Sequence, residues 1–321
     1  MDHNRSMLAQ SDLAQPLHHV TPYWALRGVT AEARQTSVKM DCHQPTGSFK
    51  IRGVGRLCQA LKAEGADAFV SSSGGNAGYA AAYAGRALEL PVTVVVPSTT
   101  PDFMRERIAG LGAEVIIEGD VWDAADRLAR KISAESGAAY VPPFDHPLLW
   151  EGHASLVDEI IACGPPPDAI VVAVGGGGLL CGVAQGLERL QLNDVTIVAV
   201  ETEGAASFAR AVEAGKPVAL ERIATIASSL GARQVANAAF DWSQKRPIAS
   251  IVVSDRDAVR ACRRFANEHL ALVEPACGAA LSLAYQDHPA LNSFKHVAIV
   301  ACGGVVVSLG KLAEWEAQLG G

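Results

Sequence analysis

The 321-residue sequence contains no apolar run close to the roughly 20 residues that a membrane-spanning helix requires. It also has no basic excess, since 27 Lys and Arg stand against 34 Asp and Glu, a net charge of −7. A nucleic-acid or anionic-membrane partner needs a basic surface, so this charge argues against both. Residues 1–19 lack the apolar core and cleavage pattern of a signal peptide, and we expect them to form a polar leader.

Cysteines in paired spacing are absent as well. The seven cysteines are odd in number and scattered, with no Cys-x-x-Cys pair, and the nine histidines show no His-x-x-x-His spacing. These absences argue against a disulfide framework and against a structural zinc site or another histidine-based metal site. We therefore expect reduced thiols and a cytoplasmic protein.

What the sequence does contain is an alternation of strand-like and helix-like segments. Seven short β-branched runs, apolar throughout, have the pattern of strands buried on both faces of a parallel sheet: 68–72, 92–97, 114–119, 169–175, 195–201, 250–254 and 296–302. Amphipathic segments such as 120–137 and 255–272 lie between these runs. The alternation predicts a doubly wound α/β architecture.

A proline-rich stretch, "VPPFDHPLLWEG" at 141–152, separates two α/β blocks. We therefore predict a small domain at 43–147. The large domain is predicted to combine residues 1–42 with residues 148–321, the N-terminal segment packing onto it.

Two glycine-rich stretches each follow a predicted strand and open a helix. In "SSSGGNAGYAAAYAG" (71–85), the glycines allow close approach of a ligand, and the helix N-terminus directs free N–H groups at an anion. A helix end capped by its own serines and Asn76 is the alternative interpretation. In "AIVVAVGGGGLLCGVAQGL" (169–187), four consecutive glycines enter a helix, a pattern typical of a single-phosphate cradle.

A dinucleotide is the competing ligand for the second stretch. The Gly-x-Gly-x-x-Gly spacing fails there, because Leu180 or Cys181 stands where the last glycine belongs. Glu201, however, ends the next strand about 20 residues on, as a ribose-binding acid would. A nicotinamide enzyme therefore stays open at this point.

A lysine and a cysteine add reactive groups to these loops. Lys50 follows Phe49 in "QPTGSFKIRG", and Cys302 ends the last predicted strand before a third glycine pair. Alone, the lysine would be interpreted as a surface residue and the cysteine as a core residue. Together with two anion-receptive loops, they indicate a phosphorylated cofactor that reacts with an amine. Pyridoxal 5′-phosphate fits this description, since its aldehyde condenses with a lysine.

The sequence resembles the fold-type II pyridoxal-phosphate enzymes, and most closely their L-serine dehydratase (serine/threonine ammonia-lyase) branch. The similarity runs from about Leu17 to Leu319 through "QPTGSFKIRG", "SSSGGNAG", "PSTTP", "PPFDHPLLWEGHAS", "VGGGGLLCGVAQGL", "ASSLGA", "VEPACGAAL" and "CGG". It implies two open, twisted, mostly parallel sheets flanked by helices, as in the tryptophan synthase β-subunit. The cofactor would lie between a large and a small domain, and a homodimer is expected.

The resemblance also assigns roles to individual residues. Lys50 would hold the cofactor aldehyde and remove the substrate α-proton. Phe49 would lie against the ring, Asn76 would bond the phenolic oxygen, and Cys302 would contact the ring nitrogen. The phosphate would be bound by Gly175, Gly176, Gly177, Gly178 and Leu179.

Two further groups of residues follow from the same resemblance. The loop that takes the substrate carboxylate would be formed by Ser73, Gly74 and Asn76. A monovalent cation, usually potassium, would be held by Glu201, Ala205 and Ser207 with backbone oxygens around Leu230 and Ala232.

The implied activity is β-elimination of L-serine to pyruvate and ammonia, and of L-threonine to 2-oxobutyrate. A threonine-preferring deaminase, a weak serine racemase and a binder without turnover are the alternatives. Related racemases carry a serine where this chain has Gly74, so racemisation is expected to be weak. Two departures from the family pattern, Val305–Val307 after the last glycine pair and Tyr79, put the rate and substrate preference in question.

Overall fold

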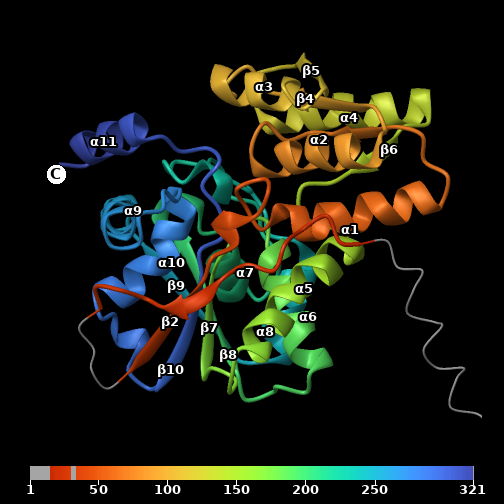
Figure 1. Ribbon diagram of the computed structural model, residues 1–321. Coiled ribbons are helices and arrows are strands. Elements are labelled where there is room, and N and C mark those ends of the chain that lie inside the picture. The colour runs from red at the N-terminus through yellow and green to blue at the C-terminus, as the bar shows by residue number, and fades with distance from the viewer. Residues whose placement is uncertain (1–14, 30–33, 321) are drawn as a thin grey trace, which may run out of the picture.

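A computed structural model describes residues 15–29 and 34–320. Most of the predicted polar leader, residues 1–14, lies outside the described residues. Figure 1 shows two α/β units of unequal size, each a sheet flanked by helices, which are joined where α1 and α5 lie against each other.

The larger sheet has six strands in the described part of the chain. Their spatial order is β1 (Tyr23–Ala25), β2 (Gln35–Lys39), β10 (His296–Val300), β7 (Ala169–Ala173), β8 (Thr196–Thr202) and β9 (Ile248–Val253). Within the described residues, β1 pairs antiparallel with β2 and every other neighbouring pair is parallel. Because the parallel strands share one direction, the loops after β7, β8 and β10 meet at a single edge.

The smaller sheet has four parallel strands in the order β5 (Glu114–Ile117), β4 (Val92–Val96), β3 (Phe69–Ser71) and β6 (Ala139–Val141). Both of its faces are covered. Val94 and Val96 join the cluster under α1 and α2, whereas Val95 points to the opposite face and packs with α4. This burial on two sides explains why the strand is apolar at successive positions.

The helices cover both faces of each sheet. The α-helices are α1 (Lys50–Ala63), α2 (Asn76–Leu88), α3 (Asp102–Ala109), α4 (Trp122–Ser136), α5 (Pro147–Ala162), α6 (Gly178–Arg189), α7 (Ser207–Ala214), α8 (Asn237–Lys245), α9 (Asp255–His269), α10 (Pro275–Tyr285) and α11 (Leu309–Gln318). The described residues also contain four 3₁₀ turns: η1 (Asp41–His43), η2 (Glu203–Ala205), η3 (Ser228–Leu230) and η4 (Pro289–Leu291). No helix within residues 15–29 and 34–320 is long and apolar enough to cross a bilayer.

The predicted α/β class and all seven predicted strands are confirmed. The expected burial on both faces is wrong for β5 and β9, which lie at sheet edges and are partly exposed. The sequence pattern does not predict β1, β2 and β6, because β2 carries polar residues and the side chains of β1 and β6 are partly exposed at several positions. Length is not the reason, since the predicted strand β3 also has three residues, all of them buried. The four strands of the smaller sheet fall between residues 69 and 141. The domain boundaries at 43 and 147 stay a prediction.

Candidate active site

Lys50 is the first residue of α1, and its position is fixed by the end of β10. The N–H of Phe49 donates to the carbonyl oxygen of Cys302 at 2.8 Å, and the N–H of Gly304 donates to the carbonyl of Gly47 at 2.9 Å. The lysine loop and the loop after β10 therefore form one unit, although about 250 residues separate them along the chain.

The Lys50 amine points into the protein. Its Nζ donates to the carbonyl oxygen of Pro143 at 2.6 Å and lies 5.1 Å from the centre of the Phe49 ring. Burial lowers the pKa of this amine to about 8, although nearby Cys302 and Glu274 act in the opposite direction. A lysine with such a pKa provides a neutral amine near physiological pH, which a surface lysine does not.

The four-glycine loop lies against the segment that receives this amine. It connects β7 to α6, and Gly177 has a φ of +89°, which favours glycine. A Cβ at Gly176 would lie 2.3 Å from the Phe144 ring, and one at Gly178 would lie 2.8 Å from the Phe144 carbonyl oxygen. Glycine is therefore required at these positions, and the bare backbone at the start of α6 has the character of an anion cradle.

Asn76, the first residue of α2, joins the smaller sheet to the larger one. Its Nδ2 donates to Oε1 and Oε2 of Glu274 at 2.9 and 3.1 Å. The hydroxyl of Ser229 donates to the same Oε1 at 2.7 Å. A Cβ on Gly175 would lie 2.9 Å from the Ser229 carbonyl oxygen, so the four-glycine loop borders this cluster too.

The loop before α2 leaves no room for a side chain at position 74. A Cβ on Gly74 would lie 2.2 Å from Oγ1 and 2.6 Å from Cγ2 of Thr100. Next to it, Ser73 Oγ accepts the N–H of Gly75 at 3.3 Å. Thr100 therefore fills the space that a residue larger than glycine would use.

Cys302 is buried at the carboxyl end of β10 beside a second thiol. Its Sγ lies 3.3 Å from Sγ of Cys277, which also donates to the Gly303 carbonyl at 2.9 Å. The hydrogen bond with Cys277, followed by burial, raises the pKa of Cys302 well above its usual value. The thiol is therefore neutral and cannot act as a negatively charged partner.

The residues predicted to bind a cation lie at the end of β8 and the start of α7. Both oxygens of Glu201 accept backbone N–H groups, from Phe208 and Ala209, each at 2.8 Å. Burial raises the pKa of Glu201 to about 7. Ala205, Leu230 and the side chain of Ser207 are buried, while Ala232 is partly exposed. Among the described residues, Ser207 Oγ has no hydrogen-bond partner.

Sequence comparison assigns the family. Residues 14–303 match the family described as "Pyridoxal-phosphate dependent enzyme". The chain belongs to the pyridoxal-phosphate-dependent enzymes. Human "L-serine dehydratase/L-threonine deaminase" is 45% identical over 95% of this chain and 97% of its own length.

Two solved structures support the same family. A fungal L-serine ammonia-lyase from Rhizomucor miehei superposes with a TM-score of 0.90, at 37% identity over 95% of this chain and 99% of its own. Maize serine racemase superposes with a TM-score of 0.86, at 26% identity over 95% and 89%. The fold-type II architecture predicted from the resemblance is confirmed.

Pyridoxal phosphate fits the residues that the structure brings together. The glycine loop offers a phosphate the bare start of α6, and Lys50 offers the aldehyde an amine. Within the described part of the chain, Asn76 Oδ1 is buried and has no hydrogen-bond partner. A buried polar atom of this kind indicates a further polar group at that position when the ligand is bound. The nicotinamide alternative is wrong, since the family match assigns pyridoxal phosphate as the cofactor. The oxygens of Glu201, which that alternative would use to bind a ribose, accept hydrogen bonds from backbone N–H groups of α7.

Residues that the sequence did not single out support this pyridoxal-phosphate site. Arg52, two residues after Lys50, is fully buried and donates to Asp41 Oδ2 at 2.7 Å and Glu159 Oε1 at 2.6 Å. Lys39 also bonds to Glu159, and the Thr21 hydroxyl donates to Asp41 at 2.7 Å. The positive charges of Arg52 and Lys39 thus balance the negative charges of Asp41 and Glu159. Their contacts fix α1 against α5 and the strand β2. Sequence spacing gives no sign of this cluster, since its members lie far apart.

The two departures from the family pattern have distinct surroundings. The Val305 carbonyl accepts a hydrogen bond from Arg107 of α3 at 2.5 Å, and a Cβ on Gly75 would lie 3.8 Å from Val306. The valine segment therefore contacts the smaller-sheet side of the site. Tyr79 is partly buried against the core cluster under α1 and α2.

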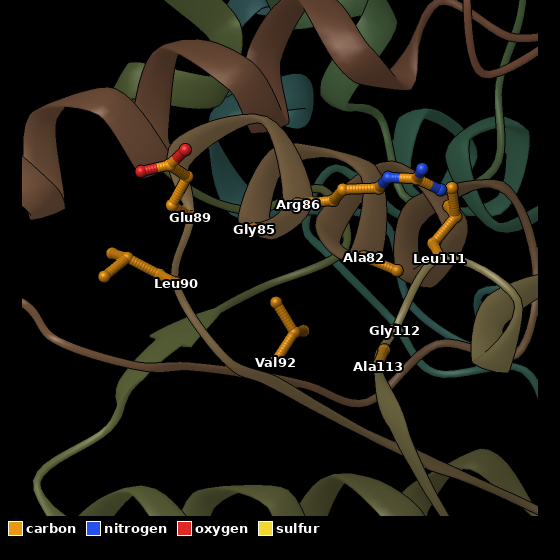
Figure 2. Close-up of a pocket in the computed structure, with 9 residues that line it drawn as sticks. All are labelled: Ala82, Gly85, Arg86, Glu89, Leu90, Val92, Leu111, Gly112 and Ala113. Atoms are coloured by element: carbon orange, nitrogen blue, oxygen red, sulfur yellow. The ribbon is translucent and has the colours of Figure 1, made fainter.

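A separate hollow of about 130 Å³ lies between the end of α2 and the loops flanking β4 and β5. Figure 2 shows its lining, which includes Arg86, Glu89 and Leu111. None of the predicted site residues lines it. The candidate active site therefore lies at the junction of the two sheets and not in this hollow.

Proposed function

We propose that this protein eliminates water from L-serine and L-threonine, with ammonia and the 2-oxo acid, pyruvate or 2-oxobutyrate, as final products. The observation that carries the proposal is the position of Lys50, whose amine has a pKa of about 8 and lies where the four-glycine loop and the loop after β10 meet. The names of the human and fungal relatives support the same reaction.

When bound, the cofactor withdraws electrons from the α-carbon of an attached amino acid and so acidifies its C–H bond. Lys50 Nζ is the group of this chain that can take that proton, because its lowered pKa leaves a substantial neutral fraction near pH 8. Phe49 and Cys302 would contact the ring, and Gly175–Gly178 with Leu179 would hold the phosphate. The neutral Cys302 thiol cannot keep the ring nitrogen protonated as a carboxylate would, which favours prompt loss of the β-hydroxyl.

The start of α2 is the proposed site for the substrate carboxylate. This helix has 13 residues, and its first N–H groups follow the loop of Ser73, Gly74 and Gly75. Free N–H groups at a helix N-terminus bind carboxylates well. Bound in this way, an amino acid would direct its α-carbon towards the amine of Lys50.

Gly74 explains why elimination is favoured over racemisation. Racemisation needs a second proton donor on the face of the α-carbon opposite Lys50, and glycine has no side chain to supply one. Thr100 occupies the space into which such a side chain would extend. The racemase alternative is therefore disfavoured by two residues.

A pair of variants tests this packing. We expect Gly74→Ser to lower the free energy of unfolding by about 1–3 kcal/mol, because its Cβ overlaps Thr100. Combining it with Thr100→Ala should restore stability, since that change removes Oγ1 and Cγ2. Urea unfolding measures the stability, and chiral chromatography measures D-serine, which we expect to rise in the double variant. Unchanged stability of the single variant would contradict the role given to Thr100.

We also propose that a potassium ion binds near Glu201, Ala205 and Ser207, with backbone oxygens around Leu230 and Ala232. Two observations support the proposal: a carboxyl group is buried at this position, and the buried Ser207 hydroxyl lacks a partner in the described part of the chain. Oxygen ligands of this kind suit a hard cation.

Ser207→Ala is the matching test. Removing the hydroxyl is expected to raise the potassium concentration for half-maximal pyruvate formation about tenfold. Stability measured without potassium should not fall, because Ser207 Oγ makes no hydrogen bond within the described residues. An unchanged potassium requirement, or a variant that is unstable without potassium, would count against the site.

The function itself is tested with a substrate panel. Purified protein with pyridoxal phosphate is given L-serine, L-threonine and D-serine, and both 2-oxo acid and ammonia are measured. We expect L-serine and L-threonine each to give 2-oxo acid and ammonia in equal molar amounts. Cofactor uptake without turnover of any substrate would favour the non-catalytic binder.

Sedimentation of the same sample tests the proposed homodimer, and fractionation of the source cells tests the proposed cytoplasmic location.

A further inference from the structure

Glu274 is a carboxyl group that the proposed reaction does not use. It precedes α10 and is only 1% exposed, at the point where both sheets approach the site. Its carboxyl oxygens accept hydrogen bonds from Asn76 Nδ2 and from the Ser229 hydroxyl. The backbone N–H of Val306 also faces it.

The charged and titratable groups around Glu274 do not balance a carboxylate. Lys50 approaches from α1, the thiols of Cys277 and Cys302 from α10 and the end of β10, and Cys262 from α9. Of these groups only Lys50 can carry positive charge, and its Nζ donates to Pro143 instead. Burial raises the pKa of Glu274, although Ser229, Asn76 and Lys50 act in the opposite direction.

Asn76 supplies the second observation. Its Nδ2 is directed at Glu274, whereas its Oδ1 is buried and finds no partner among residues 15–29 and 34–320. An amide exchanges its oxygen and nitrogen by a half-turn of the side chain. The half-turned amide would place Oδ1 against Glu274 and direct both N–H bonds away from it. An ionised carboxylate cannot donate to that oxygen, but a protonated carboxylic acid can.

We propose that Glu274 is a positioning residue that keeps its proton, donates its O–H to Asn76 Oδ1, and so turns the Asn76 N–H groups towards the ligand. The ligand group that suits two N–H donors is an anionic oxygen. For pyridoxal phosphate this is the ionised phenolic oxygen, which receives no proton from the protein in this arrangement. The inference rests on the proposed contact between Asn76 and the cofactor.

The first test compares two variants of Glu274 in cofactor titrations of the apoprotein. Glutamine is neutral and retains an N–H donor, so E274Q is expected to bind pyridoxal phosphate within about threefold of the parent. Leucine has a similar size but cannot form a hydrogen bond, so E274L is expected to bind at least about tenfold more weakly. Circular dichroism checks that both variants are folded.

The pH dependence of cofactor attachment separates a neutral from an ionised Glu274. If Glu274 is neutral, E274Q leaves the charge near Lys50 unchanged. The pH at which cofactor attachment is half-maximal should then be the same in E274Q and in the parent. A shift of about one pH unit in E274Q would overturn the proposal, since an ionised neighbour affects the pKa of a lysine by this order. Equal loss of affinity in E274Q and E274L would overturn it as well.

A second measurement does not depend on cofactor binding. The infrared spectrum of the apoprotein at neutral pH should contain the carbonyl band of a protonated carboxylic acid that disappears in E274Q. Glu201 contributes equally to both samples and cancels in the difference spectrum. Absence of the difference band overturns the proposal. Failure of the parent protein to take up pyridoxal phosphate is a different result and would reject the proposed function instead.

Discussion

Replacing Lys50 with alanine is expected to reduce pyruvate formation from L-serine at least about a thousand-fold, because the variant loses both the amine for the cofactor aldehyde and the base for the α-proton. Stability should not fall, since removing a buried amine also removes its desolvation cost. Pyruvate is measured in a coupled assay, and stability by urea unfolding.

Lys62→Ala is the matched control for this prediction. Lys62 lies in the last turn of the same helix, is exposed, and donates to the Leu88 carbonyl at 2.7 Å. Its replacement should leave the rate of pyruvate formation within about twofold of the parent's, because surface substitutions have small effects. Pyruvate formation by Lys50→Ala at a rate comparable with the control would remove Lys50 from the proposed chemistry.

Replacing Arg52 with methionine is expected to lower the free energy of unfolding by about 3–5 kcal/mol. The guanidinium is fully buried, and its loss leaves the carboxylates of Asp41 and Glu159 with too little compensating charge. Because Arg52 fixes α1 two residues after Lys50, cofactor affinity should fall as well. Urea unfolding and cofactor titration measure the two effects.

The same helix provides a close control for Arg52. Arg56 lies one turn further along α1 and pairs with Glu151 at 2.8 Å, with 39% and 46% of the two side chains exposed. Exposed ion pairs of this kind contribute about 0–1 kcal/mol. The Arg56→Met variant should therefore have almost the same free energy of unfolding as the parent. Similar losses in the two arginine variants would show that burial of the Arg52 cluster is not the source of its effect.

The prediction of the fold depended on local pattern. Runs such as 92–97 were recognisable as buried strands because apolar side chains occupy successive positions on both faces. β6 and β1 lack such a run, because their side chains are partly exposed at several positions, so their pairing with β3 and β2 decides that they are strands. Pairing between segments that lie far apart in the chain leaves no recognisable pattern in the few residues of one short strand.

Local pattern also indicates the chemical groups proposed for the site, and their roles stay predictions. Lys50, the four glycines, Asn76 and Cys302 each lie at the end of a strand or the start of a helix, where local pattern indicates a ligand. Their partners were missed, because Glu274 and Thr100 act through contacts with residues far away in the chain.

The sequence by itself determined the α/β class, the residues that could react, and the cofactor they suit, because helix periodicity, strand pattern and loop glycines are local properties. The tertiary structure alone decided which groups meet. It brought Asn76 from one sheet to Glu274 beside the other, placed Thr100 over Gly74, and enclosed Arg52 between Asp41 and Glu159. Protonation, packing and burial depend on such neighbours, and neighbours are set by how the two sheets pack together.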